Sequence, residues 1–362
     1  MKKISQEKLA KYRKLGEKSV WDIKNPQARA IFQRLEEEGC SFDDWAFNPH
    51  WGMFHAPHSR NMENADIVCV GIPMENTIPE RPGTKYGPTA VRKWSHIMGP
   101  IHHITDVVPF DMCRIVDYGD IDFTGFDLKE RIDNIYQTFL KFKESNISTL
   151  SVDGEHTMTY PILKAHGRDE PLAMIHLDAH ADTTGNIGGG DVSDANGFRH
   201  AVMDGVLDPE RTIQIGIRGR AWHFWDFSHD TGMRVVSAEE FQERGVKAMV
   251  EEARALVGND PCYLTIDNDA LDPSCMPGTG LPEPFGLTSR EVRDFIRGLR
   301  GLNIVGADIA EICPPADPTE ISANTGAALC FEMLCLLCEA HVARTGVTHK
   351  THWNPESVKE TS

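Results

Sequence analysis

The sequence predicts an α/β protein: a three-layer α-β-α sandwich around a mainly parallel sheet, with a helical N-terminal extension. Two observations favour this class. Short apolar, β-prone runs alternate with segments such as 128–143, in which apolar residues recur every three or four positions. Metal-capable side chains directly follow three of the apolar runs, which is where open α/β sheets keep their sites.

The elements are expected in a regular order. Strand, helix and strand in this rhythm require right-handed crossovers, and therefore a parallel sheet. The expected strands are residues 65–72, 113–116, 147–152, 171–175, 212–217, 262–266 and 304–309, and helices are expected from residue 89 and over 128–143, 198–205, 289–297 and 327–342.

The pattern divides the chain into three parts: an N-terminal extension (1–62), a catalytic domain (63–345) and a polar C-terminal tail (346–362). The extension has helical stretches rich in Lys and Glu, followed by an aromatic group that includes Trp45 and Phe54. We expect the extension to clamp a neighbouring surface. A part in shaping a shared active site is the alternative.

Charge and composition limit the partners and the compartment. The chain has 362 residues and a formal net charge of −17, which argues against nucleic acid or an anionic membrane and suits a cationic substrate. No apolar segment follows Met1, and no run of some 18 apolar residues is evident, so neither a secretory signal nor a membrane span is expected. Nine cysteines without a disulfide spacing fit a reducing compartment, and a cytoplasmic location is expected.

The apolar run 171–175 leads into three metal-capable residues at alternate positions, Asp178, His180 and Asp182. On extended backbone that spacing directs all three to one side. A second run, 262–266, leads into Asp267 and Asp269 in the same way.

A third run, 147–152, leads to His156. Four carboxylates gathered at one sheet edge cannot all remain ionised unless cations lie among them. Two divalent ions carry the four positive charges that would balance them. Six ligands of oxygen-rich, two-imidazole character suit Mn²⁺, Ni²⁺ or Fe²⁺ better than a single structural zinc.

Three blocks resemble the signature blocks of the ureohydrolase family, which includes arginase, agmatinase and guanidinobutyrase: Asp153-Gly154-Glu155-His156, residues 178–182 and residues 267–273. The resemblance extends from about residue 65 to the C-terminal helix. It implies an arginase/deacetylase-like fold. It also implies a binuclear metal centre whose ligands are His156, Asp178, His180, Asp182, Asp267 and Asp269.

The resemblance also implies the chemistry. Two metals would lower the pKa of a water, so that hydroxide attacks the carbon of a guanidino group and a C–N bond is hydrolysed. Asp182 would pass the proton of that water to the departing nitrogen. Glu311 would grip the substrate's guanidinium, since a carboxylate can accept two parallel N–H bonds from a planar cation.

One block departs from the family pattern. Where relatives have a His-Gly pair, this chain reads Ser193-Asp194-Ala195-Asn196-Gly197, so Asp194 takes the place of a histidine that shuttles protons and orients substrate. Asp194 or Asn196 is a candidate for contact with a different cation, and His200 for the replacement shuttle. Aromatic residues between 222 and 227 are candidates to wall a pocket for an N-alkylated cation, or to pack in the core.

The long extension, the altered block and the aromatic loop resemble the guanidine hydrolase and metformin hydrolase branch of the family. This branch implies Ni²⁺, with Mn²⁺ as the alternative, and a homo- or hetero-oligomer, a trimer or hexamer, possibly with a paralogous subunit. A guanidine or biguanide substrate is therefore expected. The alternatives are an agmatinase or guanidinobutyrase that releases urea, a single-zinc deacetylase-like enzyme, and a non-catalytic regulatory subunit.

Overall fold

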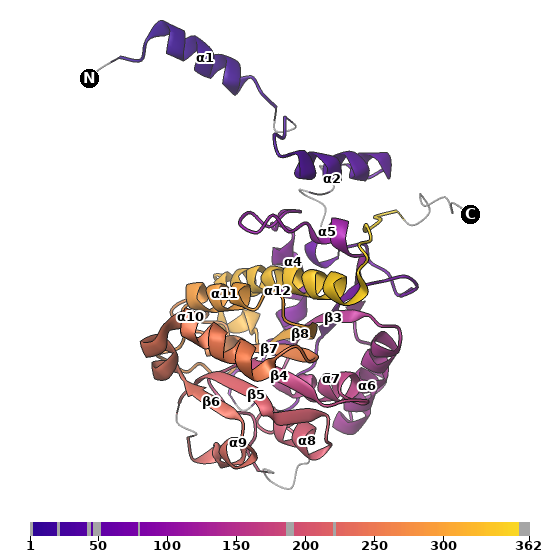
Figure 1. Cartoon of the computed structure of the whole chain (residues 1–362), viewed down its shortest axis with the longest axis vertical. Coiled ribbons are helices and arrows are strands. Elements are labelled where there is room, and N and C mark those ends of the chain that lie inside the picture. Colours follow the sequence, from indigo (N-terminus) through magenta and orange to yellow (C-terminus); the bar gives the residue numbers. More distant parts are fainter. Residues whose placement is uncertain are drawn as a thin grey trace.

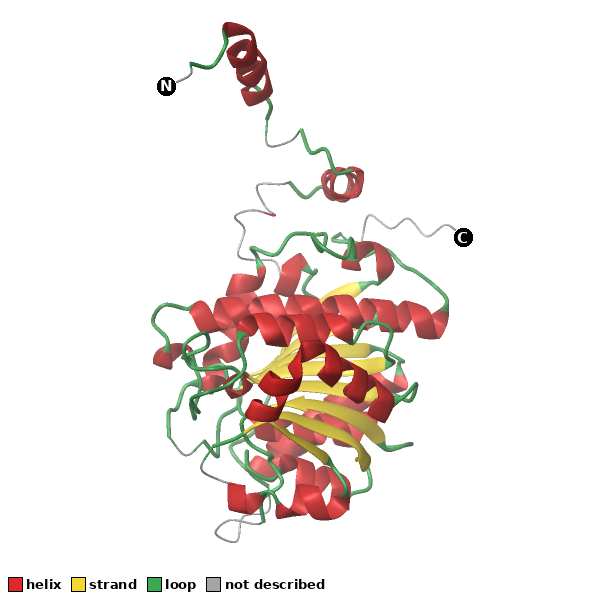
Figure 2. Cartoon of the chain, turned by 60° about the vertical axis from the view of Figure 1, so that its left-hand side comes forward, coloured by secondary structure: helices red, strands yellow, loops and turns green. Residues whose placement is uncertain are grey.

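A parallel sheet of eight strands forms the centre of the molecule, with helices on both faces (Figures 1 and 2). The computed structural model describes residues 3–19, 22–41, 45, 52–78, 80–185, 192–219 and 222–354. The strand order is β2-β1-β3-β8-β7-β4-β5-β6, and every pair is parallel. The strands are β1 (Ile67–Ile72), β2 (Ile115–Asp120), β3 (Ser148–Asp153), β4 (Leu172–Leu177), β5 (Leu207–Ile217), β6 (Arg234–Ser237), β7 (Cys262–Asp267) and β8 (Ile304–Ala310).

Burial on both faces explains why the strands read as continuous apolar runs. All six residues of β1 are buried. Ile67 and Cys69 join the apolar cluster on one face of the sheet, while Val68 and Val70 join the cluster on the other. Side chains alternate between the faces, and helices cover each face, so both sets must be apolar.

One face of the sheet is covered by α4, α10, α11 and α12, and the other by α6, α7 and α8 (Figures 1 and 2). This confirms the predicted three-layer class. The helices of the body are α4 (Gly87–Ser95), α5 (Pro109–Met112), α6 (Leu128–Glu144), α7 (Thr159–His166), α8 (Gly197–Met203), α9 (Asp226–Thr231), α10 (Ala238–Val257), α11 (Ser289–Gly298) and α12 (Ile321–Thr345).

The short helices α5, α7 and α9 were not expected from the sequence, nor were two further elements, β6 and α10. The strand has only four residues, and Arg234, Val235 and Ser237 are partly exposed, so no apolar run marks it. The helix contains Gly245 with a φ of 77°, which interrupts its periodicity. A short edge strand and a broken helix both weaken the pattern on which such predictions rest.

The N-terminal extension contains two helices, α1 (Gln6–Gly16) and α2 (Pro26–Glu37). No residue of α1 is buried, whereas α2 buries Ile31 and Leu35. The end of the extension and the start of the tail belong to the core: the ring of Trp45 stacks on His55 at 3.9 Å and meets Trp353 edge-on at 6.1 Å. Of the aromatic group in the extension, residues 47 and 51 lie outside the described residues.

The helix α12 is long and apolar enough to cross a membrane by length and composition, an exception to the expectation that no such run exists. In the structure, 72% of its most apolar 18-residue window is buried. It packs against β3 and β8 in the sandwich (Figure 1), and its apolar composition fits a core helix.

Candidate metal centre

The predicted metal ligands lie at the carboxyl ends of β3, β7 and β4, which are three of the four central strands of the sheet. His156 begins a 3₁₀ turn just after β3, and Asp269 lies in a similar turn after β7. The strands are in parallel register, with Leu177 opposite Ile266, so residues that follow them end at the same edge. The topology therefore brings three distant segments of the chain together.

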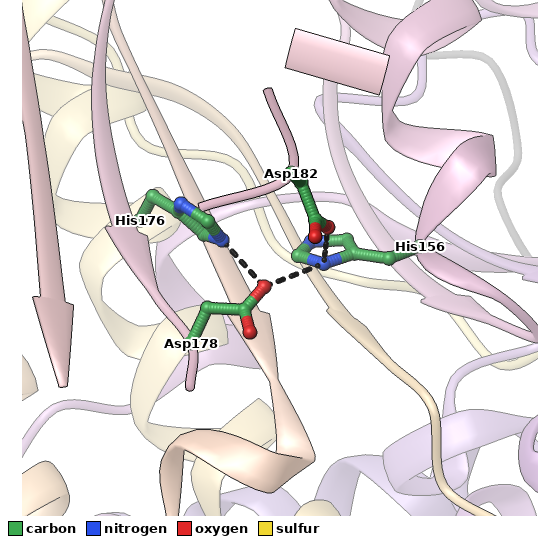
Figure 3. A group of neighbouring side chains, drawn as sticks. All are labelled: His156, His176, Asp178 and Asp182. Carbon is green, nitrogen blue, oxygen red and sulfur yellow. Dashed lines mark hydrogen bonds and ion pairs between the residues drawn. The ribbon is translucent and has the colours of Figure 1, made fainter. Parts of the chain in front are cut away.

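His156 is the centre of the first group of ligands. Its Nδ1 lies 3.1 Å from Asp178 Oδ2 and 3.1 Å from Asp182 Oδ2 (Figure 3), and 3.5 Å from Asp267 Oδ2. One ring nitrogen can donate a hydrogen bond to only one of these three carboxylates. A nitrogen and three oxygens that converge in this way form a ligand set for a cation.

His180 forms the second group. Its Nδ1 lies 3.1 Å from Asp269 Oδ2 and 3.5 Å from Asp178 Oδ1. Asp178 therefore faces His156 with one carboxylate oxygen and His180 with the other. This arrangement divides the six side chains into two adjoining sites that share Asp178.

The electrostatics fit two divalent ions. Without them, burial and then the charge of Asp178 raise the pKa of Asp182 to about 7. Burial, together with the charges of Asp269 and Asp178, raises the pKa of Asp267 well above its usual range. Two divalent ions would neutralise the four carboxylates, and the mixed oxygen and imidazole donors suit first-row metals.

A further set of buried residues holds the ligands, and sequence reasoning did not assign it. His176 Nε2 lies 2.7 Å from Asp178 Oδ2 (Figure 3). His156 Nε2 lies 2.7 Å from Thr265 Oγ1, which donates to Asp308 at 2.5 Å. The available signal was alternation: His176 precedes Asp178 by two positions, and Thr265 precedes Asp267 by two, so each pair shares a face.

A cavity of about 870 Å³ opens onto the metal ligands. Glu311 lines it with a positive φ of 65°, and its Oε1 accepts a hydrogen bond from the backbone N–H of His156 at 2.9 Å. A Cβ at Gly280 would lie 3.0 Å from Glu311 Oε2, so the glycine leaves room beside this oxygen. Burial, and then the charge of Asp267, raise the pKa of Glu311 well above its usual range.

Of the three residues proposed from the altered block, the structure brings only Asp194 to the cavity. Its backbone N–H donates to Thr77 Oγ1 at 3.0 Å, and burial raises the pKa of its carboxyl. The side chain of Asn196 instead bonds within its own segment, where its Oδ1 accepts a hydrogen bond from the backbone N–H of Ser193 at 2.8 Å. His200 faces Tyr160, with ring centres 5.7 Å apart.

The aromatic loop contributes two of its members to the cavity, Phe224 and Trp225. Phe227 instead packs against Arg199, whose guanidinium lies 4.5 Å from the ring centre. Glu283, which was not proposed from the sequence, also lines the cavity, and its Oε1 lies 3.8 Å from His180 Nε2. The glycine-rich stretch 188–190 and the side chain of residue 222 lie outside the described residues.

Comparison with known proteins identifies the family. The model of the arginase family matches residues 65–335. The chain belongs to the arginase family. The match leaves the whole N-terminal extension (1–62) outside it and supports a hydrolase over a deacetylase-like enzyme or a regulatory subunit.

Several relatives of this arginase-family protein are characterised. It is 42% identical over 277 residues to guanidinopropionase from Pseudomonas aeruginosa, covering 76% of this chain and 87% of that one. It is 37% identical over 291 residues to mitochondrial agmatinase from Gallus gallus, covering 79% and 85%. Proclavaminate amidino hydrolase from Streptomyces clavuligerus superposes with a TM-score of 0.77 and 34% identity over 80% of this chain and 97% of that one.

The names of these relatives distinguish between the two kinds of hydrolase that the sequence analysis considered. They favour the alternative, a urea-releasing enzyme of the agmatinase or guanidinobutyrase kind, over the guanidine and metformin branch.

Proposed function

We propose that this protein hydrolyses the guanidino group of a cationic guanidino compound, releasing urea and an amine. Agmatine is the leading substrate class. The observation that supports the proposal is the charge of the cavity wall above the metal ligands.

That wall is acidic. Among the described residues that line it, Lys129 is the one Lys or Arg side chain. The acidic side chains of the wall that do not belong to the ligand set are Glu80, Asp127, Asp194, Glu283 and Glu311. A guanidino acid would bring its own carboxylate into this field and find little to pair with it, whereas a second cationic group would be stabilised.

Two side chains of the cavity have separate roles in the proposed reaction. Glu311 orients the planar guanidinium by accepting its N–H bonds. Asp182 accepts a proton from the attacking water and returns it to the departing nitrogen, which cannot leave as an amide anion. The two divalent ions, when bound, supply a water of lowered pKa beside the guanidinium carbon. We propose Ni²⁺ or Mn²⁺ for this role, because the donor set accommodates either.

A substrate panel tests the proposal. Protein loaded with Ni²⁺ or Mn²⁺ is assayed for urea release from agmatine, 4-guanidinobutyrate, 3-guanidinopropionate and arginine. We expect kcat/KM for agmatine to exceed that for either guanidino acid by about tenfold or more, the effect of one uncompensated charge contact. A preference for a guanidino acid would contradict the proposal.

One observation supports a second candidate, a guanidine or biguanide substrate such as metformin. Asp194 places a third acidic group near Glu311 and Glu155, so charge is available for a cation that offers N–H bonds on several sides. Guanidine and metformin therefore join the panel, with ammonia, guanylurea and dimethylamine as products. Faster turnover of either than of agmatine would favour this candidate.

A further inference from the structure

The first helix, α1, stands away from the rest of the molecule (Figures 1 and 2). It has 11 residues and none of them is buried. Tyr12 and Leu15 are about half exposed, at 51% and 49%, and lie three residues apart on one stripe. Isolated helices shorter than about 12 residues are marginal in water, so α1 needs a surface to pack against.

The charge of this segment is opposite to that of the remaining chain. The first 19 residues contain seven Lys and Arg against two Glu, a net charge of +5. The whole chain has a net charge of −17, so the remaining residues carry −22. A basic arm is therefore attached to a strongly acidic body.

The attachment directs the arm away from its own body. Arg34 of α2 donates to Asp111 of α5 at 2.6 Å, which fixes α2 on the end of the molecule where α5 lies (Figure 1). From α2, the chain towards α1 runs outward (Figures 1 and 2). An acidic surface within reach of α1 is thus one on another molecule.

We propose that α1 docks on the acidic body of a second copy of this chain, with Tyr12 and Leu15 against apolar side chains and its Lys and Arg residues against carboxylates. A second copy offers the complementary charge at the same concentration as the arm. Phosphate surfaces, whether of a membrane or a nucleic acid, would attract the arm but repel a body that carries −22.

Isotope mixing tests the proposal. Metal-loaded full-length protein labelled with ¹⁵N is mixed with unlabelled protein, and a zero-length carbodiimide reagent joins Lys to Asp or Glu. We expect Lys8, Lys11 and Lys14 to form cross-links in which one peptide is labelled and the other is not, and high salt to reduce them. Cross-links confined to single-isotope pairs, or none from α1, would overturn the proposal.

Two variants separate docking from general reactivity. Tyr12→Ser combined with Leu15→Ser keeps every lysine, and we expect it to lower the yield of mixed-isotope cross-links about tenfold, because the apolar contact is lost. Met203→Ser, at an exposed apolar residue of α8, is the control and leaves the yield unchanged. Equal yields in the two variants would contradict the proposal. Tight binding of the wild-type arm to phosphatidylserine vesicles, with no mixed cross-links, would assign it to membranes instead.

Discussion

Asp178 is the residue on which the two ligand groups depend. Its two carboxylate oxygens face different histidines, His156 and His180, and a third histidine, His176, lies 2.7 Å from one of them. The amide of Asn, which offers one neutral oxygen and an NH₂ group, cannot take the place of both carboxylate oxygens. Its neighbours Asp182 and Asp267 each approach only the His156 group in the pairs described.

We therefore expect Asp178→Asn to remove most bound metal from both positions and to lower kcat at least about a thousandfold, as for loss of a main catalytic element. Metal content per chain, measured by mass spectrometry of the purified protein, checks the first effect. Asp204→Asn is the matched control, because Asp204 pairs with Lys164 outside the cavity. Two metals per chain in the Asp178 variant would contradict the assignment.

The proposed function gives Asp194, which lines the cavity, a part in selecting the cationic substrate. Asp194→Asn keeps the size of the side chain and removes its negative charge from the cavity wall. We therefore expect kcat/KM for agmatine to fall about tenfold to a hundredfold. For guanidino acids, whose carboxylate is repelled by the acidic wall, kcat/KM should fall less. Steady-state kinetics on both substrates measure the ratio, and Asp127→Asn, elsewhere in the same wall, serves as the comparison. An unchanged ratio would show that Asp194 has no part in selection.

At the scale of elements, the site depends on strands that end at one level and on helices that hold them there. The helix α11 begins with a capping box: Thr288 accepts from the backbone N–H of Glu291, and Glu291 accepts from that of Thr288. Its apolar stripe, with Val292, Phe295 and Ile296, is buried in the sandwich. The cap satisfies donors that would otherwise lack partners at the start of the helix.

Thr288→Ala should lower the free energy of unfolding by about 1 kcal/mol, because the hydroxyl that caps α11 is lost. Kinetic constants should stay unchanged, since α11 lies away from the cavity. Chemical denaturation of the metal-loaded protein measures the effect. Arg290→Ala is the control in the same helix, with an Arg side chain that is 83% exposed, and an equal loss in both variants would contradict a capping role.

For the whole molecule, the acidic centre makes the stability of the metal-free protein depend on pH. Burial raises the pKa of Asp182 and of Glu155 to about 7 in the folded state, against ordinary values of 3.8 and 4.5. The folded protein then holds more protons than the unfolded chain, so stability falls as pH rises towards and through 7. His55 and His166, whose pKa values fall to about 4, have the opposite effect only below about pH 6.5.

We therefore expect the Tm of chelator-treated protein to fall between about pH 6.5 and pH 8, with a loss of about 1 kcal/mol for each of the two acids. Metal-loaded protein should lose the Asp182 share of this pH dependence, because a cation takes the place of the proton on that ligand carboxylate, and should keep the share of Glu155, which is not a ligand. Glu155→Gln should reduce the slope in the metal-free state. A rising Tm over this range would contradict the pKa directions.

Many features of this structure can be predicted from short stretches of the sequence. The strand runs, the periodic helices and the ligand blocks are each contained in a few consecutive residues, because side chains alternate along a strand and recur every three or four positions along a helix. The family blocks around Asp178 and Asp267 therefore indicated the fold and the ligand set directly. The broken helix α10 and the short edge strand β6 left no such pattern and were missed.

The sequence by itself determined the class of fold and the family, and it predicted the ligand residues, because each of these depends on patterns of a few consecutive residues. Only the tertiary structure decided that Asp178 joins the two ligand groups, that Glu283, Thr265 and Asp308 support them, and that Asp194 rather than Asn196 or His200 reaches the cavity. Those facts depend on the order of strands in the sheet and on the path of loops between them. Both arise from packing between residues far apart in the chain, which no local pattern records.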